Sequence, residues 1–357
     1  MVSRVRSAQA CVFGISVALS FVSGSQAQAR PLDPIDVIER EARVAEMEHG
    51  VWGGKALEKE NGAVSSCSRW QVTLDIVDPK STVPKNITLS VVRPRNQQPS
   101  PVIVMVPTIE GPIILEDQYA SKFCRMGIAT IVADVNDTAQ PTELPSWGLE
   151  DRNNRLAILS LKTVLDYAEQ SPHFDRTKIG LLGFSLGGIT SAMMAGIEHE
   201  RLQAIYVVVG GGNLPYILSV STNDKVGELR RRRMEHSKLT KPEEYEDELR
   251  KSVRFDPMFF ASRAPTEKIF MVIADKDDKV PTLVQRDLFE SFGKPENTVF
   301  SGGHVKTIVS LTLFYFSYVE DFFRKRFNMT RGLHAETMRE LAQPKPDWAT
   351  PPTSLPR

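Results

Sequence analysis

The chain has 357 residues, of which 41% are hydrophobic and 25% charged, a composition that fits a folded globular protein and excludes a disordered or fibrous one. Lysine and arginine together number 44, and so do aspartate and glutamate, so no excess of positive charge suggests nucleic acid as a partner. The length allows one large domain or two smaller ones.

The amino-terminal end predicts a secretory signal peptide over residues 1–29. Two arginines precede an almost wholly apolar or small stretch at residues 8–22, and the small-x-small cleavage pattern Ala27-Gln28-Ala29 follows it. The apolar stretch is shorter than the ~20 residues that a spanning helix needs, which favours a cleaved leader over an uncut anchor. We therefore expect a secreted or periplasmic protein without a stable membrane anchor.

Three cysteines are present, and removal of this leader would take Cys11 with it. Cys67 and Cys124 would remain, and in an oxidising compartment they could form one disulfide. The sequence does not show whether their Cα atoms come within bridging distance. Without nearby histidines, two cysteines provide too few ligands for a metal site.

The region before the main domain is expected to be a helical extension, residues 30–69. Within it, Pro34–Gly50 carries apolar residues spaced among charges and predicts an amphipathic helix. Next, Trp70–Val77 and Asn86–Val92 each alternate polar and apolar residues, with prolines between them. This pattern predicts an antiparallel pair of strands at one edge of a sheet.

From residue 101 onward, short apolar strands alternate with helices. The predicted strands are Pro101–Val106, Ile128–Ala133, Ile179–Leu182, Leu202–Val209, Lys268–Ile273 and Thr298–Phe300. The predicted helices are Tyr119–Met126, Leu156–Ala168, Ile189–Ala195 and Val305–Phe327. Apolar strands that alternate with helices imply an α/β fold with a mostly parallel central sheet covered on both faces.

The alternation stops over about residues 213–263, a stretch longer than an ordinary connection. Thr240 and Glu243 have capping-box spacing and open a charged helix that we expect to continue through Val253. We interpret the stretch as a helical cap inserted over the open end of the sheet. The alternative is a solvated excursion of the surface.

A basic run, Arg230–Arg233, lies inside this insertion. It could bind an acidic group of a substrate, although most charge runs are simply solvated. The main domain then spans residues 70–327, and the polar, proline-containing residues 328–357 are expected to form a loosely attached tail.

Glycine, serine and glycine alternate in Gly183-Phe184-Ser185-Leu186-Gly187, between a buried strand and a helix of small and apolar residues. Strand, G-x-S-x-G and helix together are typical of a sharp turn on which a nucleophilic serine projects above the sheet. The Leu186 amide would then lie at a helix N-terminus, where it could hold an oxyanion. The alternative is a glycine-rich turn, such as a phosphate cradle, in which the serine has no special role.

A serine hydroxyl is a poor nucleophile until a base takes its proton, and the base needs an orienting acid. Loops beyond strand C-termini are where an open α/β sheet places such groups. The strand ending at Ala274 leads into aspartates 275, 277 and 278, and Phe300 leads into Gly302-Gly303-His304. Of the 6 histidines, His304 alone follows a predicted core strand, and the order Ser, Asp, His is that of the α/β-hydrolases.

The sequence resembles the α/β-hydrolase superfamily, and within it the dienelactone-hydrolase-like and secreted serine esterase or peptidase branches. The resemblance covers roughly Trp70 to Phe327. It is carried by Gly183-Phe184-Ser185-Leu186-Gly187-Gly188, Asp277-Asp278-Lys279-Val280-Pro281 and Gly302-Gly303-His304. Because the family pattern has its acid three residues before a Val-Pro pair, the resemblance implies Asp277 as the acid, with Asp275 and Asp278 as neighbours that could be confused with it.

The loop after the family's third strand corresponds to Pro107-Thr108-Ile109-Glu110-Gly111. By that match the Ile109 amide would be the second oxyanion donor, beside Leu186. Family members often begin this loop with histidine and glycine, whereas this chain has Pro107 and Thr108.

The function expected from these residues is that of a serine hydrolase acting on a carboxylic ester, with Ser185 as nucleophile, His304 as base and Asp277 as acid. No cofactor or metal is expected, and the expected partner is a small-molecule or acylated substrate. A peptidase or amidase of the same fold is the alternative, followed by a catalytically silent binding module. The sequence gives neither the acyl group nor the oligomeric state.

Overall fold

A computed structural model of the chain describes residues 29–48, 52–64, 67–76, 78, 85–95, 99–111, 114–135 and 146–330. The expected signal peptide, apart from Ala29, lies outside these residues, as does the expected tail after Thr330. Within the described ranges, no helix is both long enough and apolar enough to cross a membrane.

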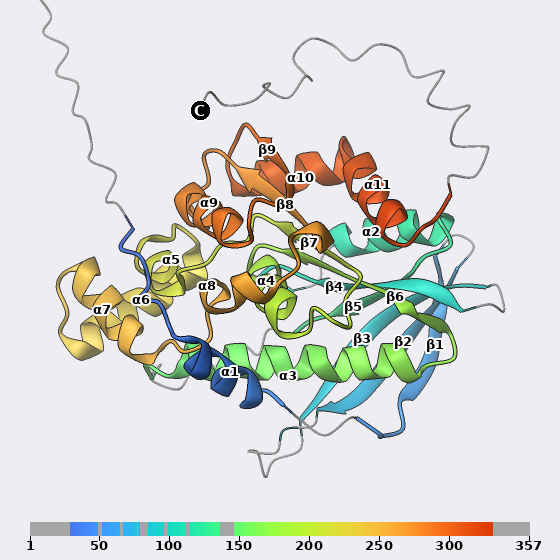
Figure 1. Cartoon of the computed structure of the whole chain (residues 1–357), viewed down its shortest axis with the longest axis horizontal. Helices are drawn as coiled ribbons and strands as arrows, with labels where there is room; N and C mark the ends of the chain where they lie inside the picture. Colours follow the sequence, from blue (N-terminus) through green and yellow to red (C-terminus); the bar gives the residue numbers. More distant parts are fainter. Residues whose placement is uncertain are drawn as a thin grey trace, which may run out of the picture.

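One sheet of nine strands forms the centre of the described part of the chain, in the order β1-β2-β3-β5-β4-β6-β7-β8-β9 (Figure 1). The strands are β1 (Leu57–Val64), β2 (Cys67–Ile76), β3 (Lys85–Pro94), β4 (Ser100–Val106), β5 (Ala129–Ala133), β6 (Phe174–Phe184), β7 (Ala204–Val208), β8 (Ile269–Ala274) and β9 (Glu296–Phe300). Along the part of the sheet with the order β5-β4-β6-β7-β8-β9, each strand is parallel to its neighbour, so the mostly parallel sheet is confirmed. The carboxyl ends of these strands consequently meet at one edge, where the loops of the site lie.

β2 pairs antiparallel with β3, as the alternation after Trp70 predicts. β3 is also antiparallel to β5, a pairing that the sequence does not indicate. The structure adds β1, which pairs with β2 inside the region expected to be a helical extension. In that region the helix α1 is limited to Val37–Ala45. Sequence patterning misses β1 because its residues lie on the surface and lack an apolar alternation. A disulfide joins Cys67 to Cys124, with Cα atoms 6.1 Å apart.

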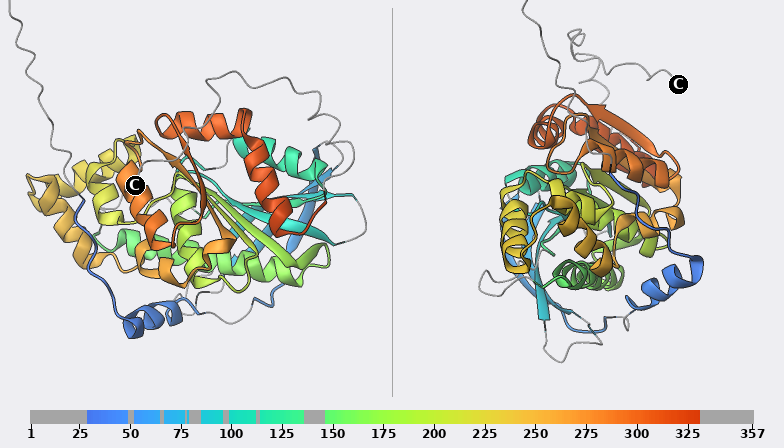
Figure 2. Two further views of the ribbon diagram at one scale, coloured as in Figure 1. Left: turned by 45° about the horizontal axis from the view of Figure 1, so that its top comes forward. Right: turned by 90° about the vertical axis from the view of Figure 1, so that its left-hand side faces the viewer.

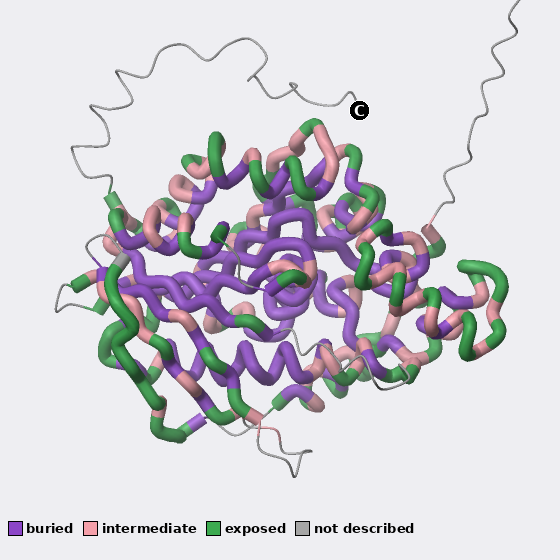
Figure 3. The backbone as a smooth tube through the Cα atoms, turned by 180° about the vertical axis from the view of Figure 1, so that it is seen from behind, coloured by how far each residue is buried: buried purple, intermediate pink, exposed green. Residues whose placement is uncertain are grey.

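Helices cover both faces of the sheet because its inner strands alternate between two apolar cores. Val102, Val104 and Val106 of β4 pack into one core with α3 (Leu149–Gln170), α4 (Leu186–Ile197) and α9 (Thr282–Ser291). Ile103 and Met105 pack into the other core with α2 (Ile114–Arg125), α10 (His304–Leu313) and α11 (Phe316–Arg326). Figure 3 shows the inner strands as the buried centre of the molecule.

The single long helix predicted at Val305–Phe327 is wrong, because the structure has two helices with a break at Phe314 and Tyr315. Tyr315 turns inward and packs edge-on against Phe300, with ring centroids 5.1 Å apart. The break redirects α11 so that Phe322 packs against Tyr206 of β7. No glycine or proline marks this break, so the apolar pattern alone continues through it.

Residues 213–263 contain four short helices: α5 (Leu214–Val220), α6 (Asp224–Ser237), α7 (Pro242–Ser252) and α8 (Pro257–Phe260). Figure 2 shows α5, α6 and α7 gathered at one end of the molecule. The expected Thr240–Glu243 capping box is shifted by one residue, because α7 begins at Pro242. It is Glu244 whose carboxylate accepts from the backbone N–H groups of Thr240 and Lys241, at 3.0 and 3.1 Å.

Two buried charged residues hold this helical cap in place, one by binding the body and the other by joining the two ends of the cap. Arg233 is 1% exposed and donates to both carboxylate oxygens of Glu150 on α3, at 2.7 and 2.9 Å. Asp256 is fully buried and accepts from the amides of Asn213, Leu214 and Met258. Burial raises the pKa of Asp256, while those three amides lower it.

The basic run Arg230–Arg233 is largely occupied by protein partners, which argues against the substrate-binding interpretation. Arg230 donates to the carbonyls of Leu218 and Ser221, and Arg231 pairs with two glutamates on its own helix. With Arg233 bound to Glu150, three of the four side chains have protein partners.

Candidate active site

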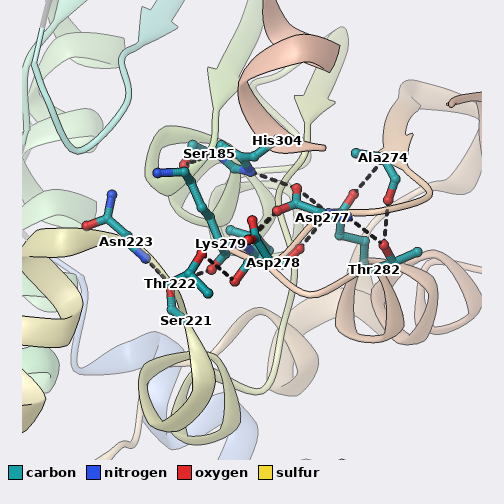
Figure 4. A network of polar contacts seen from close by, with 12 residues as sticks. Ser185, Ser221, Thr222, Asn223, Ala274, Asp277, Asp278, Lys279, Thr282 and His304 are labelled. Carbon is teal, nitrogen blue, oxygen red and sulfur yellow. Dashed lines mark hydrogen bonds and ion pairs between the residues drawn. The ribbon is translucent and has the colours of Figure 1, made fainter. Parts of the chain in front are cut away.

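Ser185 lies on the turn between β6 and α4, in a backbone conformation that side chains rarely adopt. Its φ is 56° and its ψ is −116°, a strained region for a residue with a Cβ atom. The turn is held from the neighbouring strand, where the Ser185 amide donates to the carbonyl of Val208 at 2.9 Å. The conformation directs the serine side chain to the carboxyl edge of the sheet, toward the loops that follow β8 and β9 (Figure 4).

The glycines on either side of the serine are required by close backbone contacts. A Cβ atom on Gly187 would overlap the carbonyl oxygens of Val106 and Pro107, and one on Gly183 would overlap the carbonyl oxygen of Gly187. Both obstacles are backbone atoms, which cannot rotate away. The G-x-S-x-G spacing therefore lets the β6–α4 turn pack directly against the end of β4.

His304 is the first residue of α10 and reaches Ser185 from the loop after β9. Its Nε2 lies 2.8 Å from the Ser185 Oγ. The two side chains come from positions 119 residues apart and are both buried, with 8% of Ser185 and 6% of His304 exposed. Asp275, one of the three candidate acids, instead accepts from the Gly302 amide at 2.7 Å and so braces the histidine loop.

Asp277 completes a chain of contacts with His304 and Ser185. Its Oδ2 lies 2.7 Å from the Nδ1 of His304, and its Oδ1 accepts from the amides of Lys279 and Val280 at 2.9 and 3.0 Å. The Asp277 side chain has no exposed surface. Asp278 is exposed by contrast, which separates it from the site.

Gln285 is a residue of the site that sequence reasoning misses. From the first half of α9 its Nε2 donates to the Asp277 Oδ2 at 2.8 Å and to the Val280 carbonyl at 2.7 Å. Its Oε1 accepts from the Ala274 amide at 3.1 Å. One sequence signal points to it: a glutamine between Val284 and Leu288 occupies the buried face of a helix that is otherwise apolar there.

The two amides suggested for an oxyanion site lie at neighbouring strand ends. Leu186 begins α4, so its amide is among the helix N–H groups that have no intrahelical acceptor. Ile109 lies in the turn after β4, which is hydrogen-bonded from the Gly111 amide to the Thr108 carbonyl at 2.9 Å. β4 and β6 are adjacent, with Val106 opposite Gly183. Both amides therefore lie on the rim that carries Ser185.

The chemistry available at this rim is proton transfer and nucleophilic attack. Ser185 supplies a hydroxyl, His304 a nitrogen base in contact with it, and Asp277 an anionic partner for the other ring nitrogen. In the described residues, no three or more histidine, cysteine, aspartate or glutamate side chains are grouped so that they could hold a metal ion.

Comparison with known proteins agrees with this architecture. The sequence model of the X-Pro dipeptidyl-peptidase (S15) family matches residues 85–223, a segment that includes Ser185 and ends before Asp277 and His304. No curated protein matches the sequence significantly.

Several solved structures have a similar fold. Acetyl xylan esterase 1 from Thermoanaerobacterium sp. JW/SL YS485 is 14% identical with a TM-score of 0.62, covering 84% of this chain and 96% of that one. An acetyl xylan esterase from Paenibacillus sp. R4 is 17% identical with a TM-score of 0.62, covering 87% and 95%. Est1E from Butyrivibrio proteoclasticus is 14% identical with a TM-score of 0.50, covering 72% and 99%. The chain has the α/β-hydrolase fold, as its sequence predicts.

Proposed function

We propose that this chain is a serine hydrolase that cleaves a carboxylic ester through an acyl-enzyme. One observation carries the proposal: Ser185 Oγ, His304 and Asp277 Oδ2 form a continuous relay with contacts of 2.8 and 2.7 Å. A structural serine on a glycine-rich turn has no need of a buried imidazole, nor of a carboxylate fixed behind that imidazole.

In the proposed reaction, the Ser185 hydroxyl attacks the ester carbonyl carbon while His304 Nε2 takes the hydroxyl proton. The tetrahedral intermediate collapses, the C–O bond to the alcohol breaks, and His304 returns the proton to the leaving alkoxide. Water then attacks the acyl-enzyme with the same histidine as base. The carboxylic acid leaves, and Ser185 regains its proton.

Asp277 gives the histidine a single useful tautomer. Because its carboxylate accepts from Nδ1–H, the lone pair of Nε2 is left facing the serine hydroxyl. The same negative charge stabilises the imidazolium that forms during attack. Gln285 and two backbone amides hold the carboxylate in this orientation, so little rearrangement is needed as the proton moves.

We assign the amides of Leu186 and Ile109 to the oxyanion. Each such donor is worth a factor of roughly 10² to 10³ in kcat when it is aimed at the developing charge. The location of Leu186 at the start of α4 supports its role, since helix N-terminal amides favour an anion. For Ile109 the support is the adjacency of β4 and β6.

An ester is the preferred substrate class because two solved structures that share the fold over most of this chain are described as acetyl xylan esterases. The family match to an X-Pro dipeptidyl-peptidase favours a second candidate, a peptidase acting on an amide bond. Both use the same nucleophile, so the distinction lies in the leaving group. Rates on 4-nitrophenyl esters of graded acyl length, from acetyl upward, against an X-Pro 4-nitroanilide separate the two.

Covalent labelling with a fluorophosphonate tests the nucleophile directly. The wild-type protein should label and hydrolyse esters, and Ser185→Ala should do neither. Ser191→Ala is a matched control, because Ser191 is a buried serine on the same helix whose hydroxyl has no partner among the described residues. Absence of both labelling and turnover in the wild type would leave only a silent binding module.

We also infer that the protein acts outside the cytoplasm, secreted or periplasmic, after cleavage behind Ala29. The Cys67–Cys124 disulfide supports an oxidising compartment. Amino-terminal sequencing of protein recovered from a secreting host should begin at Arg30, and recovery of the full-length chain in the cytoplasm alone would contradict the inference.

A further inference from the structure

One short segment of the cap contacts two loops of the site at once. Between α5 and α6, Thr222 donates its amide to the carbonyl of Asp278 at 3.1 Å, and the Ser221 hydroxyl donates to the carbonyl of Lys279 at 2.7 Å. Both acceptors belong to the loop that carries Asp277. Three residues later, Lys225 contacts the turn that carries Ile109.

Lys225 makes two contacts with that turn. Its Nζ donates to the Ile109 carbonyl oxygen at 3.1 Å and lies 2.9 Å from the Glu110 carboxylate. The backbone of Lys225 is itself held in place, because the Asn223 side chain caps α6 by accepting from the amides of Lys225 and Val226 at 3.1 and 3.2 Å. A capped helix start is thus linked through one ammonium group to the middle of the Ile109 turn.

The orientation of this turn decides where the Ile109 amide points. The turn spans four residues, Thr108–Gly111, and its middle residues Ile109 and Glu110 are not fully buried. The Lys225 contact holds the peptide unit between Ile109 and Glu110 from outside the turn. The neighbouring unit, which contains the Ile109 N–H, is held by the hydrogen bond from the Gly111 amide to the Thr108 carbonyl, so a shift of the Ile109 carbonyl would disturb the whole turn. An oxyanion donor needs such restriction, since its value comes from being aimed before charge develops.

We propose that Lys225 is a positioning residue of the oxyanion site, which it serves by anchoring the Ile109 carbonyl to the cap. The proposal rests on the serine-hydrolase function above. The ammonium does not touch the reacting atoms. It keeps the Ile109 amide turned toward the acyl oxygen, and it makes the cap part of the catalytic arrangement rather than a cover alone.

A simple surface ion pair is the competing explanation, and it predicts a different pattern. Lys225 and Glu110 have side chains 49% and 55% exposed, so their Coulombic attraction contributes little by itself. If the pair were all that mattered, removing either charge would have the same small effect. If the carbonyl contact matters, loss of the ammonium should be much the more damaging change.

The experiment compares four variants on 4-nitrophenyl acetate, which is uncharged and therefore gives Lys225 nothing to bind electrostatically. Lys225→Met keeps the aliphatic stem and should lower kcat on the order of tenfold with KM within twofold, a part of the effect of losing one oxyanion donor. Lys225→Arg should recover most of that loss. Glu110→Gln should lower kcat by about twofold, because the Ile109 carbonyl contact remains.

Arg231→Gln is the matched control, since Arg231 lies on the same helix and, among the residues that the structure describes, pairs with Glu228 and Glu235 on that helix. Thermal melting of each variant distinguishes a loss of folding from a displaced Ile109 amide in a folded protein. If Lys225→Met does not fold, Lys225→Gln takes its place. Unchanged kcat in the lysine variants, an equal loss in Glu110→Gln, or a rise in KM alone would overturn the proposal. A wild type that turns over no ester would instead overturn the function on which it rests.

Discussion

Replacing Asp277 with asparagine isolates the contribution of the acid with the smallest possible change of shape. In the structure every donor around this carboxylate is accounted for: Oδ2 faces His304 Nδ1 and Gln285 Nε2, and Oδ1 faces two backbone amides. An asparagine has only one oxygen to divide between these two sides. Whichever way it is oriented, its NH2 group points at N–H donors.

Two orientations can be compared. If the oxygen stays with the backbone amides, the NH2 group faces His304 and forces its Nδ1 to accept, so that Nε2 carries the hydrogen and cannot take the Ser185 proton. If the side chain flips, its NH2 group meets the amides of Lys279 and Val280, at a stability cost of about 1–3 kcal/mol for unsatisfied buried donors. The first orientation leaves His304 in the tautomer that cannot accept the serine proton. This lowers kcat about 10⁴-fold, which corresponds to about 5 kcal/mol of activation free energy.

The assay is kcat on 4-nitrophenyl acetate together with the rate of fluorophosphonate labelling, with circular dichroism to establish that each variant is folded. Asp278→Asn is the control, since that neighbouring side chain is exposed and should leave kcat within twofold. A folded Asp277→Asn variant within tenfold of wild-type kcat would refute the reasoning, as would equal losses in the two variants.

Two further predictions concern the scaffold of the site. Gly187→Ala should abolish ester hydrolysis and most soluble expression, because its Cβ atom would overlap backbone carbonyls at the end of β4. Gly148→Ala is the control and should express normally, since the added atom has open space around it. An active Gly187→Ala variant would contradict the packing argument. Replacing both Cys67 and Cys124 by serine should reduce the free energy of unfolding by about 4 kcal/mol. The disulfide joins two residues with a sequence separation of 57 and so restricts a long loop of the unfolded chain. Denaturant melts check this, and a reductant should lower the wild-type melting temperature while leaving the double variant unchanged.

Much of the fold was predictable because the parallel strands are short apolar runs bounded by turn residues, a pattern that tertiary context rarely overrides. The same pattern led to the candidate site: Ser185 comes directly after β6, Asp277 lies three residues after β8, and His304 lies four residues after β9. The choice of Asp277 among three neighbouring aspartates came from the family resemblance. What escaped prediction has no local signal. β1 lies on the surface without alternation, and the break between α10 and α11 is imposed by the packing of Tyr315.

The missing members of the site escaped for a related reason. Gln285 and Lys225 act through contacts with residues that only the fold brings near. The apolar neighbours of Gln285 on its helix indicate that it is buried but not what it contacts, and a lysine on a helix is common. A sequence can indicate which residue types a reaction needs. It cannot indicate which ordinary polar residues will end up holding them, because that depends on how the cap sits on the sheet.

The site is gathered from segments between residue 109 and residue 304, and its base belongs to the penultimate helix described here. An amino-terminal piece of the chain that ends before residue 304 contains the nucleophile without the base that activates it. During synthesis the site therefore cannot form before residue 304 has emerged from the ribosome. In refolding experiments, turnover should therefore return only once α10 has packed against the sheet and placed His304 beside Ser185.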